Sequence, residues 1–286
     1  MAVTDLTFTV PRGQVLGLLG PDDAGKSTTL RVLAGSVAAT SGTVRVAGWD
    51  VEAQSREARH HVGYLAERTP LYDEMRVGPY VAMMANLRGV PRRLRRARVD
   101  GALEACGLGD RRREVIGRLA AGARVRVGLA QAVVHGPEVL LLDEPAAGLD
   151  VEQAGETRAL VAELALGRTV MVSGRTLAEV DALCDRVLCM EAGRLVADEP
   201  PARVSERRTR EVMAVVAGDA AELERQVRAL VGVTSVAVSP AGENVHRVTV
   251  AGDREDLQDA IARTVVEGGF GLRELTSRPA GGEGSA

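Results

Sequence analysis

The chain has 286 residues, of which 45% are hydrophobic, and a formal net charge of −3. This length suits one large or two modest domains, and the slightly acidic balance argues against nucleic acid as a partner. Aromatic residues make up only 2% of the chain, so a function that depends on stacked rings has few candidate residues. No stretch approaches the roughly 18 apolar residues of a membrane span, and the N-terminus lacks a signal-peptide pattern. We therefore expect a cytoplasmic protein that reaches a membrane only through partner subunits.

The first predicted elements are a buried strand at 15–19 and a helix at 26–34, joined by a glycine-containing loop. The loop satisfies the pattern G-x-x-x-x-G-K-[ST], in which backbone N–H groups surround the β-phosphate of a nucleotide. In that pattern Lys26 reaches the β- and γ-phosphate oxygens, and Ser27 holds Mg²⁺. A merely tight strand-to-helix turn would explain the glycines but not the Lys26–Ser27 pair. The predicted nucleotide-binding residues of this loop are Gly20, Asp22, Asp23, Ala24, Gly25, Lys26, Ser27 and Thr28.

Short apolar strands alternate with helical patterns as far as Glu199, which predicts an α/β domain with a mostly parallel sheet covered by helices. The block at 70–132 is helical and predicts a subdomain of its own. It contains a basic run, Pro91–Arg98, which is expected to be the solvated face of a helix; a phosphate- or lipid-binding patch is the alternative. The three cysteines lack metal-binding spacing and are expected to be buried free thiols.

The segment Val139–Asp150, VLLLDEPAAGLD, carries adjacent acids at a strand end. A buried apolar strand delivers Asp143 beside the phosphate loop, where it can hold Mg²⁺ through water. Glu144 follows as the general base that can polarise an attacking water. A solvated strand end would also carry adjacent acids, but these follow an apolar run and precede a proline turn. The segment predicts Mg²⁺ and water chemistry, or its remnant.

The pattern changes after the strand expected at 193–199, where Pro200 and Pro201 interrupt the chain. From about Glu211 the order is β-α-β-β-α-β, the split ferredoxin-like α+β plan. No catalytic constellation stands in this part, so we expect a dimerisation or regulatory module. The predicted boundaries are 1–205 for the first domain, 206–278 for the second and 279–286 for a disordered tail.

These motifs resemble those of the ATP-binding subunits of ABC transporters, nearest the gliding-motility and the sodium- or drug-export kinds. GPDDAGKSTT matches the Walker A loop, VLLLDEP Walker B, AAGLD the D-loop, and VGYLAERTPLYDEM the coupling loop. The match runs from about Ala2 to Glu199, and the C-terminal module also resembles the domain appended to such subunits. The resemblance implies a P-loop ABC-type nucleotide-binding domain with a helical subdomain, which binds ATP and Mg²⁺.

The resemblance also implies roles for residues outside the Walker loop. Glu67, in the coupling loop, would join Ser27 and Asp143 around the metal. Such subunits pair head to tail, so each ATP lies between the Walker motifs of one chain and the signature of a second nucleotide-binding domain, where Gly122 would face it. The other implied partners are transmembrane permease subunits, docked through about Glu67–Met84. The implied location is peripheral, on the inner face of the cell membrane.

Several departures from the family pattern lie at positions that bind phosphate or act in hydrolysis in that family. LAAGA, at 119–123, stands where the family has its L-S-G-G-Q type signature, so Ala120 replaces the serine that bonds the γ-phosphate across the dimer. An unreplaced donor costs about 1.5–3 kcal/mol. Arg175 occupies the position of the switch histidine, and a guanidinium is always charged and can only donate. Arg175 either grips the γ-phosphate like an arginine finger or faces solvent with no phosphate contact. The two predicted catalytic residues are Glu144 and Arg175.

Asp23 replaces a glycine of the loop. Aspartate tolerates positive φ at a cost of roughly 1 kcal/mol. At about 7 Å from one phosphate charge, with an effective dielectric near 20, its repulsion is on the order of 2 kcal/mol. Nucleotide binding should weaken around tenfold or more unless Arg175 or Mg²⁺ compensates. Only Met1–Val3 precede TDLTFTV, so the aromatic that stacks on adenine in the family is not expected. Its absence should cost roughly 1–3 kcal/mol of the free energy of nucleotide binding.

These departures predict slow or absent hydrolysis. Arg175 and Asp23 affect the site on this chain's own Walker motifs, whereas Ala120 affects the partner's site. The alternative is a catalytically inactive pseudo-ATPase that acts as a scaffold or regulatory subunit of the complex. A soluble ABC protein of translation or DNA repair would carry tandem nucleotide domains or long coiled coils. A small-molecule kinase would not carry LLLDEPAAGLD.

Overall fold

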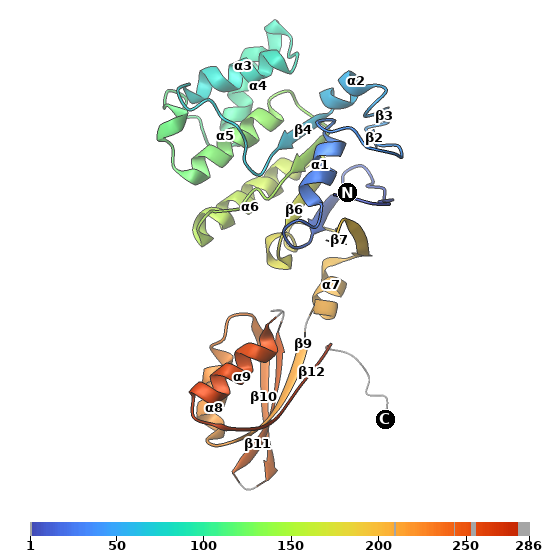
Figure 1. Cartoon of the computed structure of the whole chain (residues 1–286). Coiled ribbons are helices and arrows are strands. Elements are labelled where there is room, and N and C mark those ends of the chain that lie inside the picture. The colour runs from blue at the N-terminus through green and yellow to red at the C-terminus, as the bar shows by residue number, and fades with distance from the viewer. Residues whose placement is uncertain (1, 209, 243, 253–255, 280–286) are drawn as a thin grey trace. The chain divides into compact units, whose positions relative to one another are not determined.

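The computed structural model describes residues 2–208, 210–242, 244–252 and 256–279. The chain divides into two compact units, Met1–Pro201 and Ala202–Ala286. Figure 1 shows the first in blue to yellow and the second in orange to red. The division falls four residues before the boundary predicted after residue 205.

The first unit is built on a six-stranded sheet in the order β4-β5-β6-β1-β7-β8. Neighbouring strands from β4 to β7 run parallel, and β8 runs antiparallel to β7. β1 and β5 bury almost every residue because both faces of a parallel sheet are covered. The α/β class is confirmed. The strands are β1 (Val15–Leu19), β4 (Val62–Leu65), β5 (Val139–Leu142), β6 (Thr169–Gly174), β7 (Arg186–Glu191) and β8 (Arg194–Glu199), with a separate ribbon of β2 (Arg45–Val46) and β3 (Trp49–Asp50).

The order of strands positions the nucleotide loop. β1 leads through this loop into α1, and it lies between β6 and β7 in the sheet (Figure 1). Parallel strands end at the same edge, so the segments that follow β1, β5 and β6 meet there. The helices of the first unit are α1 (Lys26–Leu33), α2 (Ser55–His60), α3 (Val77–Leu87), α4 (Arg92–Ala105), α5 (Ala121–Val133) and α6 (Val151–Ala165), with 3₁₀ turns η1 (Ile116–Arg118) and η2 (Leu177–Glu179).

The predicted helical subdomain corresponds to α3, α4 and α5, which pack against one another. Tyr80 of α3 is almost fully buried there, and its hydroxyl pairs with Gln131 of α5. The basic run opens α4, and Arg96 is 94% exposed, so this run forms a solvated face as expected. The expected burial of the cysteines is also observed, at Cys106, Cys184 and Cys189.

The second unit contains a four-stranded antiparallel sheet in the order β10-β11-β9-β12. The strands and helices follow the order β-α-β-β-α-β, which confirms the ferredoxin-like plan. Its core joins sheet residues such as Val216 and Val248 to Leu223 of α8 and Ile261 of α9. The elements are α7 (Pro201–Arg208), β9 (Arg210–Ala217), α8 (Ala220–Arg228), β10 (Val233–Gly242), β11 (Val245–Gly252), α9 (Leu257–Glu267) and β12 (Gly271–Pro279).

The end of the chain differs slightly from expectation. Pro279, the first residue of the predicted disordered tail, belongs to β12. The rest of that prediction, 280–286, lies outside the described residues. Within the described ranges, none of the helices has both the length and the apolar character of a membrane-spanning helix.

Candidate functional site

The loop between β1 and α1 has the backbone of a phosphate-binding loop. Gly25 has a φ of 99° and Asp23 a φ of 64°, so aspartate occupies the left-handed region as expected. A Cβ at Gly25 would also lie 2.7 Å from the carbonyl oxygen of Ala2. Both the positive φ and the lack of space therefore require glycine at this position. α1 begins without a side-chain cap, which leaves its first N–H groups without partners in the helix. Such an end is where a phosphate group binds.

Other predicted loop residues hold this backbone in place. A Cβ at Gly20 would lie 2.4 Å from the carbonyl oxygen of Met190, so the loop passes directly over β7. Ala24 is buried, and its carbonyl accepts the N–H of Gly193 at 3.1 Å. Thr28 lies in the first turn of α1. These residues shape the loop through their backbone and small size.

The Lys26 side chain is buried against the loop, with 4% exposed. Its Nζ donates to the carbonyl oxygens of Gly20 at 2.7 Å and Pro21 at 2.9 Å. The same atom lies 3.3 Å from Oε1 of Glu144. A buried ammonium requires partners of this kind. The cation is therefore anchored inside the loop, beside the acid predicted as the general base.

Asp143 connects the two Walker segments. Its Oδ1 accepts hydrogen bonds from Ser27 Oγ at 3.0 Å and from Ser173 Oγ at 2.8 Å. Ser173, at the end of β6, is 2% exposed and also accepts the N–H of Glu144 at 2.9 Å. Burial and then the charge of Asp143 raise the pKa of Tyr64 to about 12. One hydroxyl, that of Ser173, thus holds both acids in position.

Glu144 is engaged by a cation on each carboxylate oxygen. Its Oε1 faces Lys26, and its Oε2 accepts a hydrogen bond from Arg175 Nε at 2.8 Å. The side chain is 7% exposed, and its φ of 44° is unusual for a residue other than glycine. Backbone in this region costs on the order of 1–3 kcal/mol. Since a general base must present an oxygen to water, this arrangement holds Glu144 away from that task.

Arg175 has two carboxylate partners, which neither predicted alternative, a γ-phosphate contact or a solvent-facing side chain, included. Besides Glu144, its Nε lies 3.1 Å from Oδ1 of Asp22. The hydrogen bond to Glu144, followed by the charges of Glu144 and Asp22, raises the pKa of Arg175. Among the described residues Arg175 pairs with Asp22 rather than with Asp23, whose compensation by Arg175 or Mg²⁺ stays an open condition. Arg175 bridges the phosphate loop and the predicted base.

Gly122 lies in the first turn of α5, as the signature motif requires, but its N–H is already bonded. Oε1 of Gln153 accepts it at 3.1 Å. Gln153 is oriented in turn by Asp150, whose carboxylate accepts its side-chain N–H at 2.6 Å and its backbone N–H at 2.8 Å. Ala120, at the N-cap of α5, provides no side-chain bond. The end of the signature helix is therefore capped from α6.

Of the three predicted metal residues, Ser27 and Asp143 are joined by a hydrogen bond, whereas no hydrogen bond or ion pair among the described residues joins Glu67 to either. Glu67 is exposed in the segment after β4. Its charge is the weakest of the influences that raise the pKa of Arg175, after those of Glu144 and Asp22. The role of Glu67 at a metal stays a prediction.

The residues present fit a magnesium ion and a nucleotide. The Ser27 hydroxyl and the Asp143 carboxylate, 3.0 Å apart, are oxygen donors of the kind that Mg²⁺ prefers, directly or through bound water. The uncapped N-terminus of α1 and the Lys26 ammonium fit the phosphates. Ser27 and Asp143 would hold the ion, which would neutralise phosphate charge there.

Sequence reasoning missed Ser173 and Gln153. Ser173 gave a signal, because it is a polar residue that interrupts the apolar strand TVMV before the switch position. Gln153 gave none, since a glutamine in the first turn of a helix is ordinary. Both act through contacts between segments that only the folded sheet brings together.

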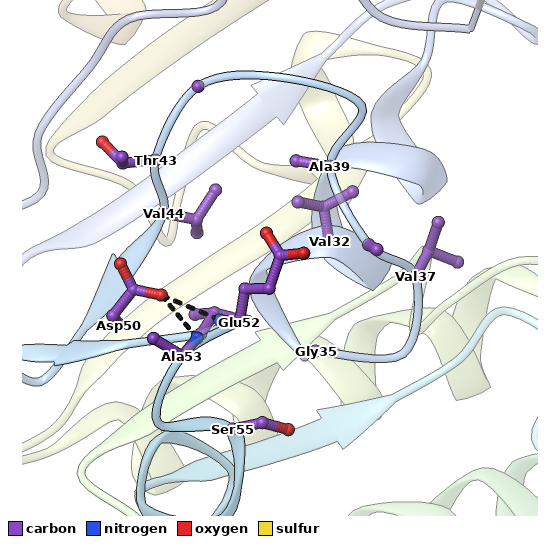
Figure 2. Close-up of a pocket in the computed structure, with 13 residues that line it drawn as sticks. Val32, Gly35, Val37, Ala39, Thr43, Val44, Asp50, Glu52, Ala53 and Ser55 are labelled. Atoms are coloured by element: carbon purple, nitrogen blue, oxygen red, sulfur yellow. Dashed lines mark hydrogen bonds between the residues drawn. The ribbon is translucent and has the colours of Figure 1, made fainter.

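A hollow of about 410 Å³ lies beside the C-terminal end of α1, outside the predicted site. Figure 2 shows Val32 on one wall and the Asp50 carboxylate accepting the N–H groups of Glu52 and Ala53, at 3.0 and 2.9 Å. These two backbone hydrogen bonds, that of Ala53 first, lower the pKa of Asp50. None of the predicted nucleotide, metal or catalytic residues lines this hollow.

Comparisons with known proteins show the family of this chain. A family model described as "ABC transporter" matches residues 3–147. The chain is 32% identical over 197 residues to the ABC transporter ATP-binding protein NatA of Bacillus subtilis, covering 68% of this chain and 80% of NatA. It is 32% identical over 286 residues to the Nod factor export ATP-binding protein I of Burkholderia lata, covering 98% of this chain and 89% of that protein. Against YhcH of Bacillus subtilis, 34% identical, it spans 63% of that protein's length.

Solved structures give the same result. The cbiO1 protein of Clostridium perfringens, described as part of the ABC transporter complex cbiONQ, superposes with a TM-score of 0.65 at 28% identity. The match covers 71% of this chain and 83% of that one. A dimeric ATP-binding cassette in a post-hydrolysis state, bound to ADP and phosphate, superposes with a TM-score of 0.63 at 20% identity, which bears on the fold alone.

Proposed function

Because the chain belongs to the ABC transporter family and is an ATP-binding subunit, we propose that it binds MgATP at the loop before α1 and couples this binding to transmembrane export partners. Its similarity to the Nod factor export ATP-binding protein I favours export. The partners are permease subunits, docked on the helical subdomain around Glu67–Met84, and a second nucleotide-binding domain. The protein lies on the inner face of the cell membrane, held by those subunits.

One observation carries the proposal. Lys26, Ser27 and Asp143 converge from two sequence-distant segments onto the uncapped end of α1. The ammonium supplies charge for the β- and γ-phosphates, the N–H groups enclose the phosphates, and the two oxygens supply metal ligands. A fold alone does not provide this constellation, since function depends on the site.

The same geometry favours binding over turnover. Lys26 Nζ donates to two loop carbonyls and lies beside Glu144, and the phosphate oxygens of a nucleotide would compete for this ammonium. Arg175 would still hold Oε2 of Glu144, which limits its ability to accept a proton from water. Slow hydrolysis follows.

A second candidate function is a non-hydrolysing scaffold or regulatory subunit of the same complex. The Arg175–Glu144 ion pair is the observation that favours it. In that case bound nucleotide holds the subunit in one arrangement and no phosphate is released.

Calorimetric titration of the full chain with MgATP and MgADP tests the proposal. We expect micromolar dissociation constants and a loss of at least about a hundredfold in Lys26→Ala, because a charged, buried phosphate partner is removed. Thr43→Ala, a change in the hollow of Figure 2 away from the loop, is the control and should bind normally. Absence of binding by the unmodified chain would refute the proposal. Phosphate release measured on the same samples separates the slow enzyme from the scaffold.

A further inference from the structure

Five basic side chains from four separate segments gather at one place in the helical part of the first unit, away from the nucleotide loop. We call this set the cationic cluster. α2 contributes from its last turn, α3 from its C-cap, α4 from its middle, and the segment after α5 from its start. Its members are Arg59, His60, Arg88, Arg98 and His135.

Contacts with neighbouring glycines and rings place these side chains close together. The rings of His60 and His135 lie 6.4 Å apart between centroids. A Cβ at Gly89, directly after Arg88, would lie 3.6 Å from Cε1 of His60. A Cβ at Gly136, directly after His135, would lie 2.7 Å from Nη1 of Arg98. The four segments therefore converge on one spot.

Arg88 is the centre of the cluster and lacks a counter-charge. Its side chain is half-buried, and no hydrogen bond or ion pair joins its guanidinium to any residue that the structure describes. Burial and then the charge of Arg59 lower the pKa of Arg88. The nearby acid Glu138 is already paired, with His61 at 2.9 Å and with Arg12 at 3.0 Å. A partly desolvated arginine among like charges is costly unless an anion compensates it.

His135, another member of the cluster, has a ring nitrogen without a hydrogen-bond partner among the described residues. Its Nε2 donates to the carbonyl oxygen of Val62 at 3.1 Å, and its buried Nδ1 has no partner among the described residues. Burial first, followed by the charges of Arg88, His60 and Arg98, lowers the pKa of His135 to about 4, although the bond to Val62 opposes this. An anion in the cluster would offset the charges of Arg88, His60 and Arg98, though not the burial, and would give a protonated Nδ1 an acceptor.

Helix dipoles explain only part of the arrangement. The C-terminal ends of α2 and α3 favour cations, which accounts for Arg59, His60 and Arg88 singly. His135 likewise follows the C-cap of α5, but Arg98 comes from the middle of α4, so no helix end accounts for its position. The basic run that ends with Arg98 thus has one member directed to a specific place, whereas Arg96 of the same run is solvated.

We propose that the cationic cluster is a binding site for a phosphate-type oxyanion, either a free phosphate group or the phosphate of a membrane lipid headgroup. Arg88 supplies the planar donor pair that suits phosphate oxygens, Arg59 and Arg98 add positive charge, and the two histidines add ring nitrogens. Leu87, directly before Arg88, is 69% exposed. An exposed leucine beside arginines suits the boundary between headgroups and acyl chains, so the lipid is the favoured source.

The histidine signals of the full chain test the site directly. The chain has four histidines, so each can be assigned by a single His→Gln variant and titrated by NMR. A Lys26→Ala background keeps phosphate from binding at the loop before α1. We expect sodium phosphate, against chloride at equal ionic strength, to raise the pKa of His135 from about 4 by at least about one unit. Arg88→Gln should abolish this response, Arg88→Lys should keep part of it, and Arg93→Gln, on the exposed start of α4, should leave it unchanged.

Vesicles distinguish the two sources. Diffuse attraction to an anionic surface predicts that Arg88→Gln and Arg93→Gln each weaken binding about fivefold. A headgroup site predicts a loss of more than about tenfold for Arg88→Gln alone on phosphatidylglycerol vesicles, with no binding to phosphatidylcholine. A His135 response to phosphate without selective vesicle binding assigns the site to soluble phosphate. If His135 does not respond to phosphate or to phosphatidylglycerol vesicles, the proposal is wrong.

Discussion

The two halves of the nucleotide site depart from the family pattern in opposite ways. On the Walker side, which comprises the loop before α1 and the acids after β5, a charge has been added, because Arg175 holds Glu144. On the signature side, the segment 119–123 at the start of α5, a donor has been removed at Ala120, and Gln153 caps the helix instead. An added charge acts on water activation within one chain. A missing hydroxyl acts on closure against a second domain.

The largest effect is expected when the added charge is removed. Arg175→His frees Oε2 of Glu144 and supplies a ring that can both accept and donate. Because general-base catalysis contributes about 10²–10⁴-fold, we expect MgATP turnover to rise about a hundredfold, measured as phosphate release by the full chain. Arg175→Gln, which removes the cation without supplying an imidazole, should produce a smaller rise. Unchanged turnover in Arg175→His would show that the ion pair is not what limits hydrolysis.

Two matched substitutions distinguish the carboxylate of the Walker side that should favour MgATP binding, Asp143, from the one that should oppose it, Asp23. Asp143→Asn should weaken MgATP binding about tenfold, since a neutral amide is a poorer ligand for Mg²⁺ than a carboxylate. Removal of Mg²⁺ with excess EDTA should weaken ATP binding by the unmodified chain to the same level. Asp23→Asn, the same chemical change within the loop, should strengthen binding, because it removes a repulsion on the order of 2 kcal/mol. Calorimetry measures all of these values, and shifts of equal sign would contradict the assignment.

Restoring the missing hydroxyl at Ala120 tests the role of the signature side in closure against a second domain. Ala120→Ser adds a donor for the ATP of a second domain and also an N-cap for α5. We expect ATP-dependent self-association to tighten about tenfold, as light scattering can measure. In the self-associated dimer each ATP lies between residue 175 of one chain and residue 120 of the other. Combined with Arg175→His, the gains in turnover should multiply if the two positions act on separate steps, water activation and closure. Strong non-additivity would mean that both act on the same step.

The smallest effect is expected for the hydrogen bond between the Gly122 N–H and Gln153, which caps α5 from within the chain. Gln153→Ala removes the acceptor of the Gly122 N–H and should lower the free energy of unfolding by about 1 kcal/mol, measured by urea denaturation. Glu152→Ala, at an exposed position of the same helical turn, removes only a favourable charge–dipole term and should cost a few tenths of a kcal/mol. Equal losses would indicate that Gln153 contributes nothing beyond its place in the helix.

Much of the fold was predictable because its signals are local. The loop after β1 combines a strand pattern, glycines and a helix start within adjacent residues. The second unit changes between two-residue and helical periods in an order that few folds share. Asp143 and Glu144 were identifiable for the same reason, since they directly follow an apolar strand.

The electrostatics of the site were less predictable because they depend on distant segments. Both interpretations of Arg175 concerned phosphate, whereas its partners are two carboxylates, one of them 31 residues away in sequence. The Ser173 hydroxyl reaches Asp143 only because β5 and β6 are neighbours in the sheet. Strand order decides which polar groups meet, and sequence periodicity does not specify strand order.

The position of β1 has a consequence for how the protein is made. The ribosome completes this apolar strand early, but its two neighbours, β6 (Thr169–Gly174) and β7 (Arg186–Glu191), are translated last among the parallel strands. Until then both edges of β1 are open to incorrect pairing. A nascent chain that stalls before residue 191 therefore cannot form its phosphate loop, and the first unit must wait for most of its own sequence before it can bind a nucleotide.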